Sequence, residues 1–313
     1  MELKKFNGLI AAPFAPMDQN GDLNLGIIPE YYDLLRHNQV GGVFINGSTG
    51  EGASLTCGEK KDVVEAWADA GSGDGDIRII NLVGGTSLRE CIDLAIYSAE
   101  KGIDAVAVMA PYYFKPSSLA LLGEFIGAVA SSVPGMPVYY YHIPVLTGVN
   151  FPMIRLLEYV DGRIPNFAGI KYTYDDLMDF CRCLEYGQKK YNILWGRDEI
   201  LLSALALGAE GAVGSTYNYA APLYQSIITS FSEGNNGQAR LLQLKSMEMV
   251  SLLAKYGGIG AGKSFMKYIG IDCGDFRLPV RSLNEEEHNR FLDDVKALDM
   301  TGLFSRKPSK QLI

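Results

Sequence analysis

Residues 166–171 read Asn-Phe-Ala-Gly-Ile-Lys, a short apolar run that ends in a lysine. A run of this length and composition predicts a buried β-strand. Its apolar neighbours would direct Lys171 toward the protein interior, where the amine must be either paired or neutral. A neutral lysine attacks ketones to form a Schiff base. A strand-end lysine can instead lay its stem on apolar surface and keep its head in water, and the segment alone favours that structural interpretation.

Similar runs recur on both sides of this one. The predicted strands cover residues 8–14, 42–46, 77–83, 105–110, 137–142, 167–171, 193–196 and 212–214. Amphipathic stretches such as 59–70 and 87–101 lie between them and predict helices. Eight apolar strands alternating with helices indicate a parallel sheet that is covered on its outer face. That number is typical of a (β/α)8 TIM barrel. The alternative, a doubly wound sheet, usually has a glycine-rich turn after its first strand, whereas residues 11–16 read AAPFAP.

The alternation of strands and helices stops after Tyr219. Residues 221–298 predict helices only, among them 237–256 with Leu242, Met249 and Leu253 on one face. The sequence therefore predicts an α/β fold with a TIM barrel at residues 1–220. Residues 221–313 are expected to form a C-terminal helical extension of the same domain.

Composition excludes several classes of function. The chain has 313 residues, a formal net charge of −8 and no long basic run, so nucleic-acid binding is not expected. No apolar run reaches the ~18–20 residues that cross a bilayer, and the N-terminus lacks a signal-peptide apolar region. The five cysteines and three histidines follow no disulfide or metal-ligand spacing. We expect a reduced, cytoplasmic protein without a structural metal.

Two motifs at predicted strand ends could bind and activate a substrate. In GSTGEG, residues 47–52, Ser48 and Thr49 offer hydroxyl and amide groups to an anion. A plain glycine-rich turn explains the same residues equally well. In YYYH, residues 139–142, strand alternation places Tyr139 and Tyr141 on one face and the other two residues on the opposite face. A tyrosine near an amine nucleophile can transfer protons to a substrate oxygen, although core packing accounts for at least one of the three. We assign His142 to structure.

Two further motifs follow the seventh and eighth strands. In WGRDE, residues 195–199, Asp198 and Glu199 could accept hydrogen bonds from a polyol, together with Ser215 from GSTYN at 214–218. They could also simply favour a helix dipole. The candidates from all these motifs share one position, the carboxyl end of a predicted strand, which is the end that carries the chemistry in such barrels. They are Ser48, Thr49, Tyr113, Tyr141, Lys171, residues 196–199 and Ser215.

A nucleotide-binding motif is also present. Residues 257–264, GGIGAGKS, match the P-loop pattern G-x-x-x-x-G-K-[ST]. A P-loop requires a preceding strand, so that the next helix presents its N-terminus to phosphate. A long helical pattern precedes this segment instead. We interpret it as a glycine-rich connection between helices. A P-loop nucleotide-binding protein remains an alternative function of a different class.

The chain resembles the N-acetylneuraminate lyases of the dihydrodipicolinate synthase/N-acetylneuraminate lyase superfamily of class I aldolases. The matching strings are GSTGEG at 47–52, APYYFKP at 110–116, YYYHIPVLTGV at 139–149, GIKYT at 169–173, WGRDEILLSALALGAEGAVGSTYNY at 195–219 and RLP at 277–279. The resemblance implies a TIM barrel, usually a homotetramer. It also implies cleavage of N-acetylneuraminate to pyruvate and N-acetylmannosamine without a metal or organic cofactor.

The resemblance assigns roles to residues of this sequence. Lys171 would form the Schiff base, and Tyr141 would exchange a proton with the sugar hydroxyl where the carbon–carbon bond breaks. The expected substrate-binding residues are Ser48 and Thr49 at the carboxylate, Thr173 at the reacting hydroxyl, and Gly196, Asp198, Glu199 and Ser215 along the sugar chain. Tyr113 matches, more weakly, an aromatic position that relatives sometimes place across a subunit interface.

One position separates the relatives from one another. Dihydrodipicolinate synthases carry an arginine after the catalytic tyrosine to bind a second carboxylate, and Leu146 stands in that string here. A neutral amino sugar would not need the cation. A 2-keto-3-deoxy sugar acid aldolase and a dihydrodipicolinate synthase-like enzyme remain alternatives. A further alternative is that the protein is not an enzyme but a non-catalytic sugar-acid sensor.

Overall fold

Eight parallel strands form a closed barrel in chain order, which confirms the predicted TIM barrel. The structure is a computed structural model, and it describes residues 4–73 and 75–308. The strands are β1 (Gly8–Ala11), β2 (Gly42–Ile45), β3 (Arg78–Leu82), β4 (Ala105–Met109), β5 (Val138–His142), β6 (Phe167–Tyr172), β7 (Asn192–Trp195) and β8 (Gly211–Gly214).

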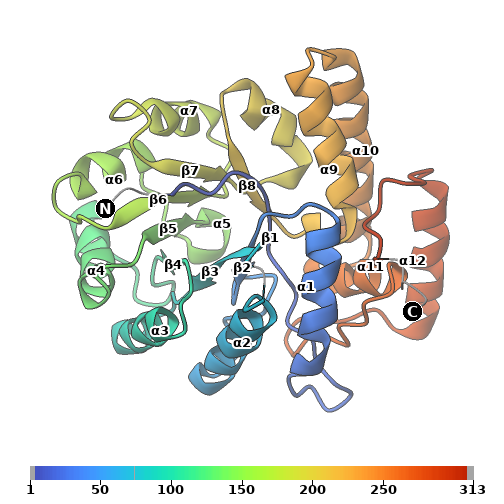
Figure 1. The fold of residues 1–313 in the computed structure, drawn as a ribbon, viewed down its shortest axis with the longest axis horizontal. Coiled ribbons are helices and arrows are strands. Elements are labelled where there is room, and N and C mark those ends of the chain that lie inside the picture. The colour runs from blue at the N-terminus through green and yellow to red at the C-terminus, as the bar shows by residue number, and fades with distance from the viewer. Residues whose placement is uncertain (1–3, 74, 309–313) are drawn as a thin grey trace.

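Helices follow the strands and cover the outside of the barrel, as Figure 1 shows. They are α1 (Ile28–His37), α2 (Cys57–Ala70), α3 (Leu88–Glu100), α4 (Leu119–Ser132), α5 (Pro144–Thr147), α6 (Met153–Val160), α7 (Leu177–Glu185), α8 (Leu201–Ala206) and α9 (Tyr217–Ser232). Local sequence fixes several of their first turns. Thr56 and Glu59 form a reciprocal capping box at the start of α2.

The first strand is shorter than predicted. The prediction ran to residue 14, whereas β1 ends at Ala11. Ala12 still donates a backbone hydrogen bond to Gly214 O, but Pro13 has no N–H to continue the ladder. The chain therefore leaves the barrel three residues earlier than expected.

Strand alternation sorts the side chains of β5 as expected. Tyr139 and Tyr141 belong to the cluster inside the barrel, while Tyr140 packs in the larger cluster between the strands and the helices. His142 also lies outside, against the rings of Tyr140 and Tyr172. The inner cluster is apolar and buried, so the barrel centre below the strand ends is a packed core.

The C-terminal helices pack together along one side of the barrel (Figure 1). They are α10 (Asn236–Lys255), α11 (Gly262–Tyr268) and α12 (Glu285–Ala297), and α10 packs closely on α9. The prediction of helices only from 221 to 298 was wrong for residues 271–284, which lie in no helix. Gly274 at φ +63° and Pro279, which has no backbone N–H, do not fit a continuous helix there.

The P-loop-like segment connects two helices, as the sequence predicted. Helix α10 precedes it, Gly257 has φ +93°, and a 3-10 turn η3 (Gly258–Ala261) leads into α11. Lys263 is buried and lies 2.8 Å from Glu51 Oε1, so its amine is already paired. The context that a P-loop requires is therefore missing from this segment.

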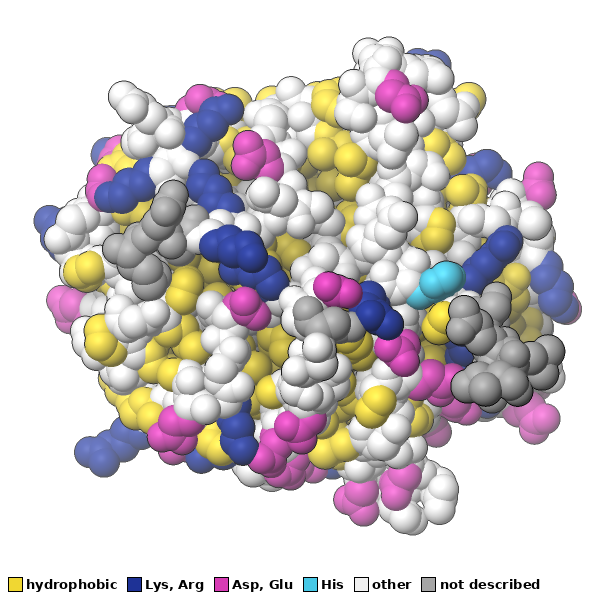
Figure 2. All heavy atoms as spheres, in the orientation of Figure 1, with side chains coloured by type: hydrophobic (Ala, Val, Ile, Leu, Met, Phe, Trp, Pro, Cys, Tyr) yellow, Lys and Arg dark blue, Asp and Glu magenta, His cyan; other side chains and the backbone are white. Residues whose placement is uncertain are grey.

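Charged side chains are mixed by sign on the molecular surface. Figure 2 shows lysines and arginines interspersed with aspartates and glutamates on the face that it draws, without a continuous cationic stripe. Within residues 4–73 and 75–308, none of the helices combines the length and apolar character required to span a bilayer.

Candidate active site

A cavity of about 220 Å³ opens at the carboxyl ends of the strands. Eight of the ten residues proposed from the sequence line it: Thr49, Tyr141, Lys171, Thr173, Gly196, Asp198, Glu199 and Ser215. They come from β2, β5, β6, β7, β8 and the turns that follow them. The barrel thus brings together groups that are up to about half the chain apart in sequence.

Lys171 lies at the apolar centre of this cavity. Its neighbour Ile170 packs outward against the helices, so the lysine of β6 points inward. The side-chain nitrogen Nζ lies 3.9 Å from the ring centre of Phe44 and 4.0 Å from that of Tyr141. Burial lowers the pKa of Lys171 to about 7, although the charge of Asp198 acts in the opposite direction. At neutral pH a large share of the amine is unprotonated and available for attack on a carbonyl.

Tyr141 lies beside that amine with its hydroxyl among other hydroxyls. Burial raises the pKa of Tyr141 to about 12, while the side chains of Ser48 and Thr173 act to lower it. The phenol is therefore protonated at neutral pH and can pass its proton along this group. Of the three hydroxyl-bearing residues Tyr141, Ser48 and Thr173, Ser48 alone does not line the cavity.

Thr173 presents a buried hydroxyl to the cavity beside Tyr141. Its Oγ1 is buried and has no hydrogen-bond partner of good geometry in the described part of the chain. A Cβ at position 196 would collide with this hydroxyl, so only glycine fits opposite it. Buried polar groups rarely stay unpaired. The hydroxyl and the backbone of Gly196 thus mark a place where a polar ligand group fits.

Asp198 is buried beside the strand end of β8. It opens the 3-10 turn η2 (Asp198–Ile200), and its Oδ2 accepts hydrogen bonds from Thr216 N at 2.9 Å and Thr216 Oγ1 at 2.6 Å. Desolvation raises the pKa of Asp198 to about 6, and the Thr216 hydrogen bonds limit the rise. A Cβ on Gly214 would overlap the carboxylate, so that glycine makes room for it.

Glu199 is held at the rim of the cavity by Arg197. The guanidinium contacts Glu199 Oε1 through Nε at 2.8 Å and Nη2 at 2.7 Å, and its Nη1 pairs with Asp175. Both contacts to Glu199 involve the same oxygen, so within residues 4–73 and 75–308 Oε2 has no such partner and can accept from another donor. The adjacent acidic residues therefore have different environments, one buried and one at the rim.

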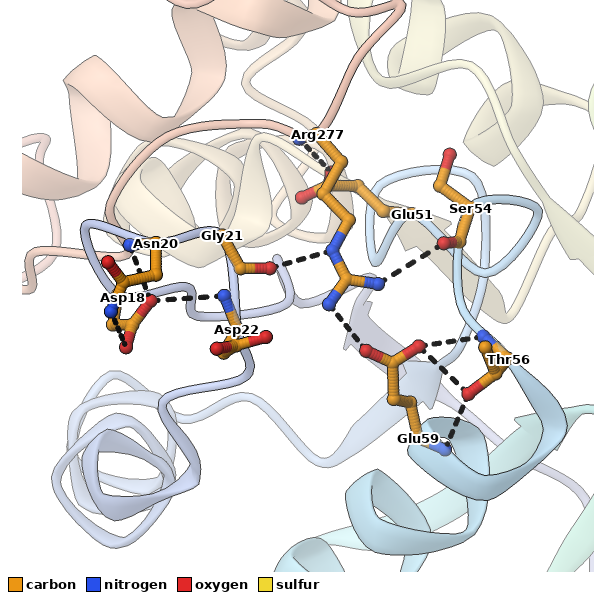
Figure 3. A network of polar contacts seen from close by, with 9 residues as sticks. All are labelled: Asp18, Asn20, Gly21, Asp22, Glu51, Ser54, Thr56, Glu59 and Arg277. Atoms are coloured by element: carbon orange, nitrogen blue, oxygen red, sulfur yellow. Dashed lines mark hydrogen bonds and ion pairs between the residues drawn. The ribbon is translucent and has the colours of Figure 1, made fainter.

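The GSTGEG turn is tied to the C-terminal segment. Glu51, at φ +55°, pairs with Lys263 and accepts a 2.8 Å hydrogen bond from Arg277 N through Oε2. Figure 3 shows the Arg277 guanidinium reaching Gly21 O, Ser54 O and Glu59. These contacts fix the turn that presents Thr49 to the cavity.

Tyr113 lies outside the site. Its side chain is 77% exposed and packs edge-on against Phe114 rather than lining the cavity. The structure of one chain does not bring it to Tyr141.

Several residues of the site were not predicted from the sequence. Phe44 contacts the lysine, Thr216 holds Asp198, and Val250 and Leu253 of α10 close one wall. Strand alternation could have placed Phe44 inside the barrel. Nothing local in α10 shows that it packs over the strand ends.

Comparisons with known proteins agree with this geometry. A family model described as the dihydrodipicolinate synthetase family matches residues 5–298. The N-acetylneuraminate lyase of Mus musculus is 37% identical over 313 residues, which cover 99% of this chain and 98% of the relative. That of Xenopus tropicalis is 42% identical over 289 residues, with coverages of 91% and 94%.

Solved structures give the same result. The Proteus mirabilis N-acetylneuraminate lyase superposes with a TM-score of 0.91 at 36% identity, covering 95% of this chain and 99% of the other. The enzyme of the same name from Aliivibrio salmonicida gives a TM-score of 0.92 at 35% identity, with coverages of 95% and 98%. The similarities span nearly the whole chain and confirm the resemblance found in the sequence motifs. The chain belongs to the dihydrodipicolinate synthetase family.

Proposed function

We propose that this protein is a class I aldolase that cleaves N-acetylneuraminate to pyruvate and N-acetylmannosamine. The observation that carries the proposal is the Lys171 amine, buried between two aromatic rings with its pKa lowered to about 7. The names of the relatives supply the substrate, since the four relatives compared above, at 35–42% identity, are all N-acetylneuraminate lyases.

The reaction follows from the neutral amine. Lys171 Nζ adds to the substrate ketone at C2, and loss of water leaves a protonated imine. As the C3–C4 bond breaks, its electron pair moves into the imine to form an enamine, and the C4 hydroxyl loses its proton to become the aldehyde of N-acetylmannosamine. Tyr141 is the group proposed to relay that proton. Protonation of the enamine at C3 and addition of water then release pyruvate and the free lysine.

The surrounding groups are proposed to hold the substrate along its length. Ser48 and Thr49 would bind the carboxylate, and Thr173 would orient the C4 hydroxyl. Gly196, Asp198, Glu199 and Ser215 would hold the sugar chain. Within residues 4–73 and 75–308, the buried Thr173 Oγ1 has no hydrogen-bond partner of good geometry, and Arg197 contacts only Oε1 of Glu199; both observations support these roles.

The segment after Tyr141 favours this substrate over the dihydrodipicolinate synthase reaction. Leu146 is 62% exposed and provides no cation for a second carboxylate. Lys115, which packs against Gly148 in that segment, is exposed and does not line the cavity. A neutral amino sugar fits a site with these features better than an aldehyde that carries a carboxylate.

Coupled detection of released pyruvate tests the substrate. We expect turnover of N-acetylneuraminate and much weaker cleavage of a 2-keto-3-deoxy sugar acid. Pyruvate consumption with aspartate semialdehyde should be negligible. Preferred turnover of either alternative substrate would replace the sialic acid assignment. Sugar-acid binding without any turnover would favour the sensor.

Assembly and location are part of the same proposal. The side chains of Tyr113, Phe114, Val145 and Leu146 are 77%, 86%, 80% and 62% exposed, a density of apolar surface that is typical of an interface. This supports association between copies of the chain, and the family resemblance supplies the proposed number of four. We also propose a cytoplasmic location, and a single domain in which residues 221–313 extend the barrel of residues 1–220.

A further inference from the structure

A series of hydrogen-bonded, buried hydroxyls holds the side chain of Asp198. Thr216, which is 2% exposed, gives both its backbone N–H and its hydroxyl proton to Asp198 Oδ2. Oδ1 receives no hydrogen bond within the described ranges 4–73 and 75–308, and Asp198 lines the cavity. One oxygen is thus fully occupied by the protein, and the other remains for a ligand.

The Thr216 hydroxyl is itself held by Tyr224. The two oxygens are 2.8 Å apart, and Tyr224 is fully buried on α9. Because the Thr216 hydroxyl donates its one proton to Asp198, Tyr224 must be the donor in its contact with Thr216. The order Tyr224 to Thr216 to Asp198 therefore directs every donor toward the carboxylate. Such a chain strengthens the last hydrogen bond and fixes its direction.

Helix α10 holds the backbone of the same residue. Gln243, which is 5% exposed, donates through Nε2 to the carbonyl oxygen of Asp198 at 3.3 Å. Its Oε1 accepts from Leu202 N at 2.8 Å, and its amide also contacts the buried Ser246. Two helices at the end of the barrel thus restrain Asp198 at its side chain and at its main chain.

We propose that Thr216, held by Tyr224, is a positioning residue that directs Asp198 Oδ1 at the hydroxyl groups of the substrate. The inference rests on the proposed function and names the element that recognises a polyhydroxylated chain. Pyruvate carries no such hydroxyls, so the hydrogen bonds from Tyr224 through Thr216 to Asp198 affect sugar-acid binding and leave imine formation with pyruvate unchanged. The helices after the barrel thereby select for long sugar acids over short oxo acids.

Two measurements on Thr216→Val and Thr216→Ser test this role. The first is kcat and KM for N-acetylneuraminate, and the second is borohydride trapping of pyruvate on Lys171. Thr216→Val keeps the shape and loses the hydroxyl, so we expect kcat/KM to fall about 10- to 100-fold, mainly through KM. Pyruvate trapping should not change. Thr216→Ser retains the donor and should behave as the unsubstituted enzyme does.

The pH profile adds a readout that loss of packing would not produce. Donors to Asp198 favour its ionised form, so removing one raises its pKa. Lys171, with its pKa near 7, titrates in the same range, so kcat/KM is divided by the rate of imine formation with pyruvate at each pH. The acid limb of this ratio should move to higher pH in Thr216→Val and stay in place in Thr216→Ser. A limb that does not move in Thr216→Val would contradict the positioning role.

Ser98→Ala is the matched control. Ser98 is fully buried and its hydroxyl bonds Leu94 O and Asn81, away from the cavity. Its loss should leave both measurements unchanged. If Thr216→Val does not fold, Tyr224→Phe carries the test, with a smaller loss of kcat/KM in the same direction.

The outcomes separate this inference from the proposed function. Cleavage by the unsubstituted enzyme with unchanged kcat/KM in Thr216→Val and Tyr224→Phe overturns the positioning role alone. Equal loss of cleavage and pyruvate trapping also overturns it, because the effect would then be general. Absence of cleavage by the unsubstituted enzyme overturns the proposed function and this inference with it.

Discussion

The chemistry proposed for this protein depends on the protonation state of a single side chain. The Lys171 amine lies between two aromatic rings in a desolvated barrel, and the charge that acts on its pKa is that of Asp198. A fully solvated lysine would be neutral in only about one molecule in 10³ at pH 7. Placement inside the barrel therefore does most of what nucleophile activation requires.

The rate of imine formation with pyruvate should rise with pH through about 7. The native pKa of Lys171 is lowered to about 7, so its reactive neutral form grows as pH increases across that value. The rate should level off well below the ~10.4 of an ordinary lysine. Stopped-flow measurement from pH 5.5 to 10 checks this, and a rate that still climbs steeply above pH 9 would mean that Lys171 is not desolvated.

Tyr141→Phe should separate proton transfer from nucleophilic attack. The phenol, with its pKa raised to about 12, stays protonated over the working range and is proposed to relay the C4 proton. We expect kcat for N-acetylneuraminate to fall by about 10²- to 10⁴-fold, the usual value of general acid–base catalysis. Pyruvate trapping on Lys171 should persist. An unchanged kcat would remove Tyr141 from this role.

At the scale of elements, the barrel site depends on a segment that is distant in sequence. The β2–α2 turn carries Ser48 and Thr49, and its Glu51 is anchored by Lys263 on α11 and by the backbone of Arg277 (Figure 3). This explains why the lysine of the P-loop-like segment is buried. Its amine neutralises Glu51 and does not bind a phosphate.

Breaking this buried pair should cost far more than breaking an exposed one. Lys263→Met leaves the Glu51 carboxylate buried without its counterion, a loss of about 3–5 kcal/mol in the free energy of unfolding. Glu51→Gln combined with Lys263→Met removes both charges and should restore most of it. Denaturant titration measures both variants.

Arg281→Met serves as the control for that experiment. Arg281 pairs with Glu287 at 2.9 Å but its side chain is 67% exposed. Surface pairs contribute about 0–1 kcal/mol, so a small effect is expected. Equal losses of unfolding free energy in Lys263→Met and Arg281→Met would show that burial does not make the Lys263–Glu51 pair more important for stability than an exposed pair.

The elements differ in how far they could be predicted from sequence. Strand alternation was enough to predict that Tyr141 and His142 lie on opposite faces of β5, because the two-residue period of a strand is local. The structure places Tyr141 inside the barrel and His142 outside it. The early end of β1 depends on Pro13, which the prediction included in a strand because the residues around it are apolar. Gly274 and Pro279 are local signals against a helix at residues 271–284, which the prediction did not use. The wall formed by Val250 and Leu253 depends on tertiary packing, which has no local signal.

At the scale of the whole molecule, the exposed apolar surface beside the site predicts association. Light scattering should give a mass near four times 34.2 kDa. Phe114→Glu places a charge on a side chain that is 86% exposed in the single chain and should shift the mass downward. Leu278→Glu, at 88% exposure on another segment, is the control and should leave the mass unchanged. A monomer in the unsubstituted protein would contradict the proposed tetramer.

The measurement that tests the central claim most directly is intact mass after borohydride reduction in the presence of pyruvate. Unsubstituted protein and Lys171→Ala are compared, and the modified peptide is then sequenced. The account predicts one reduced pyruvate adduct per chain on Lys171, and none in Lys171→Ala. An unsubstituted protein that acquires no adduct, or an adduct on another lysine, would contradict the Schiff-base mechanism.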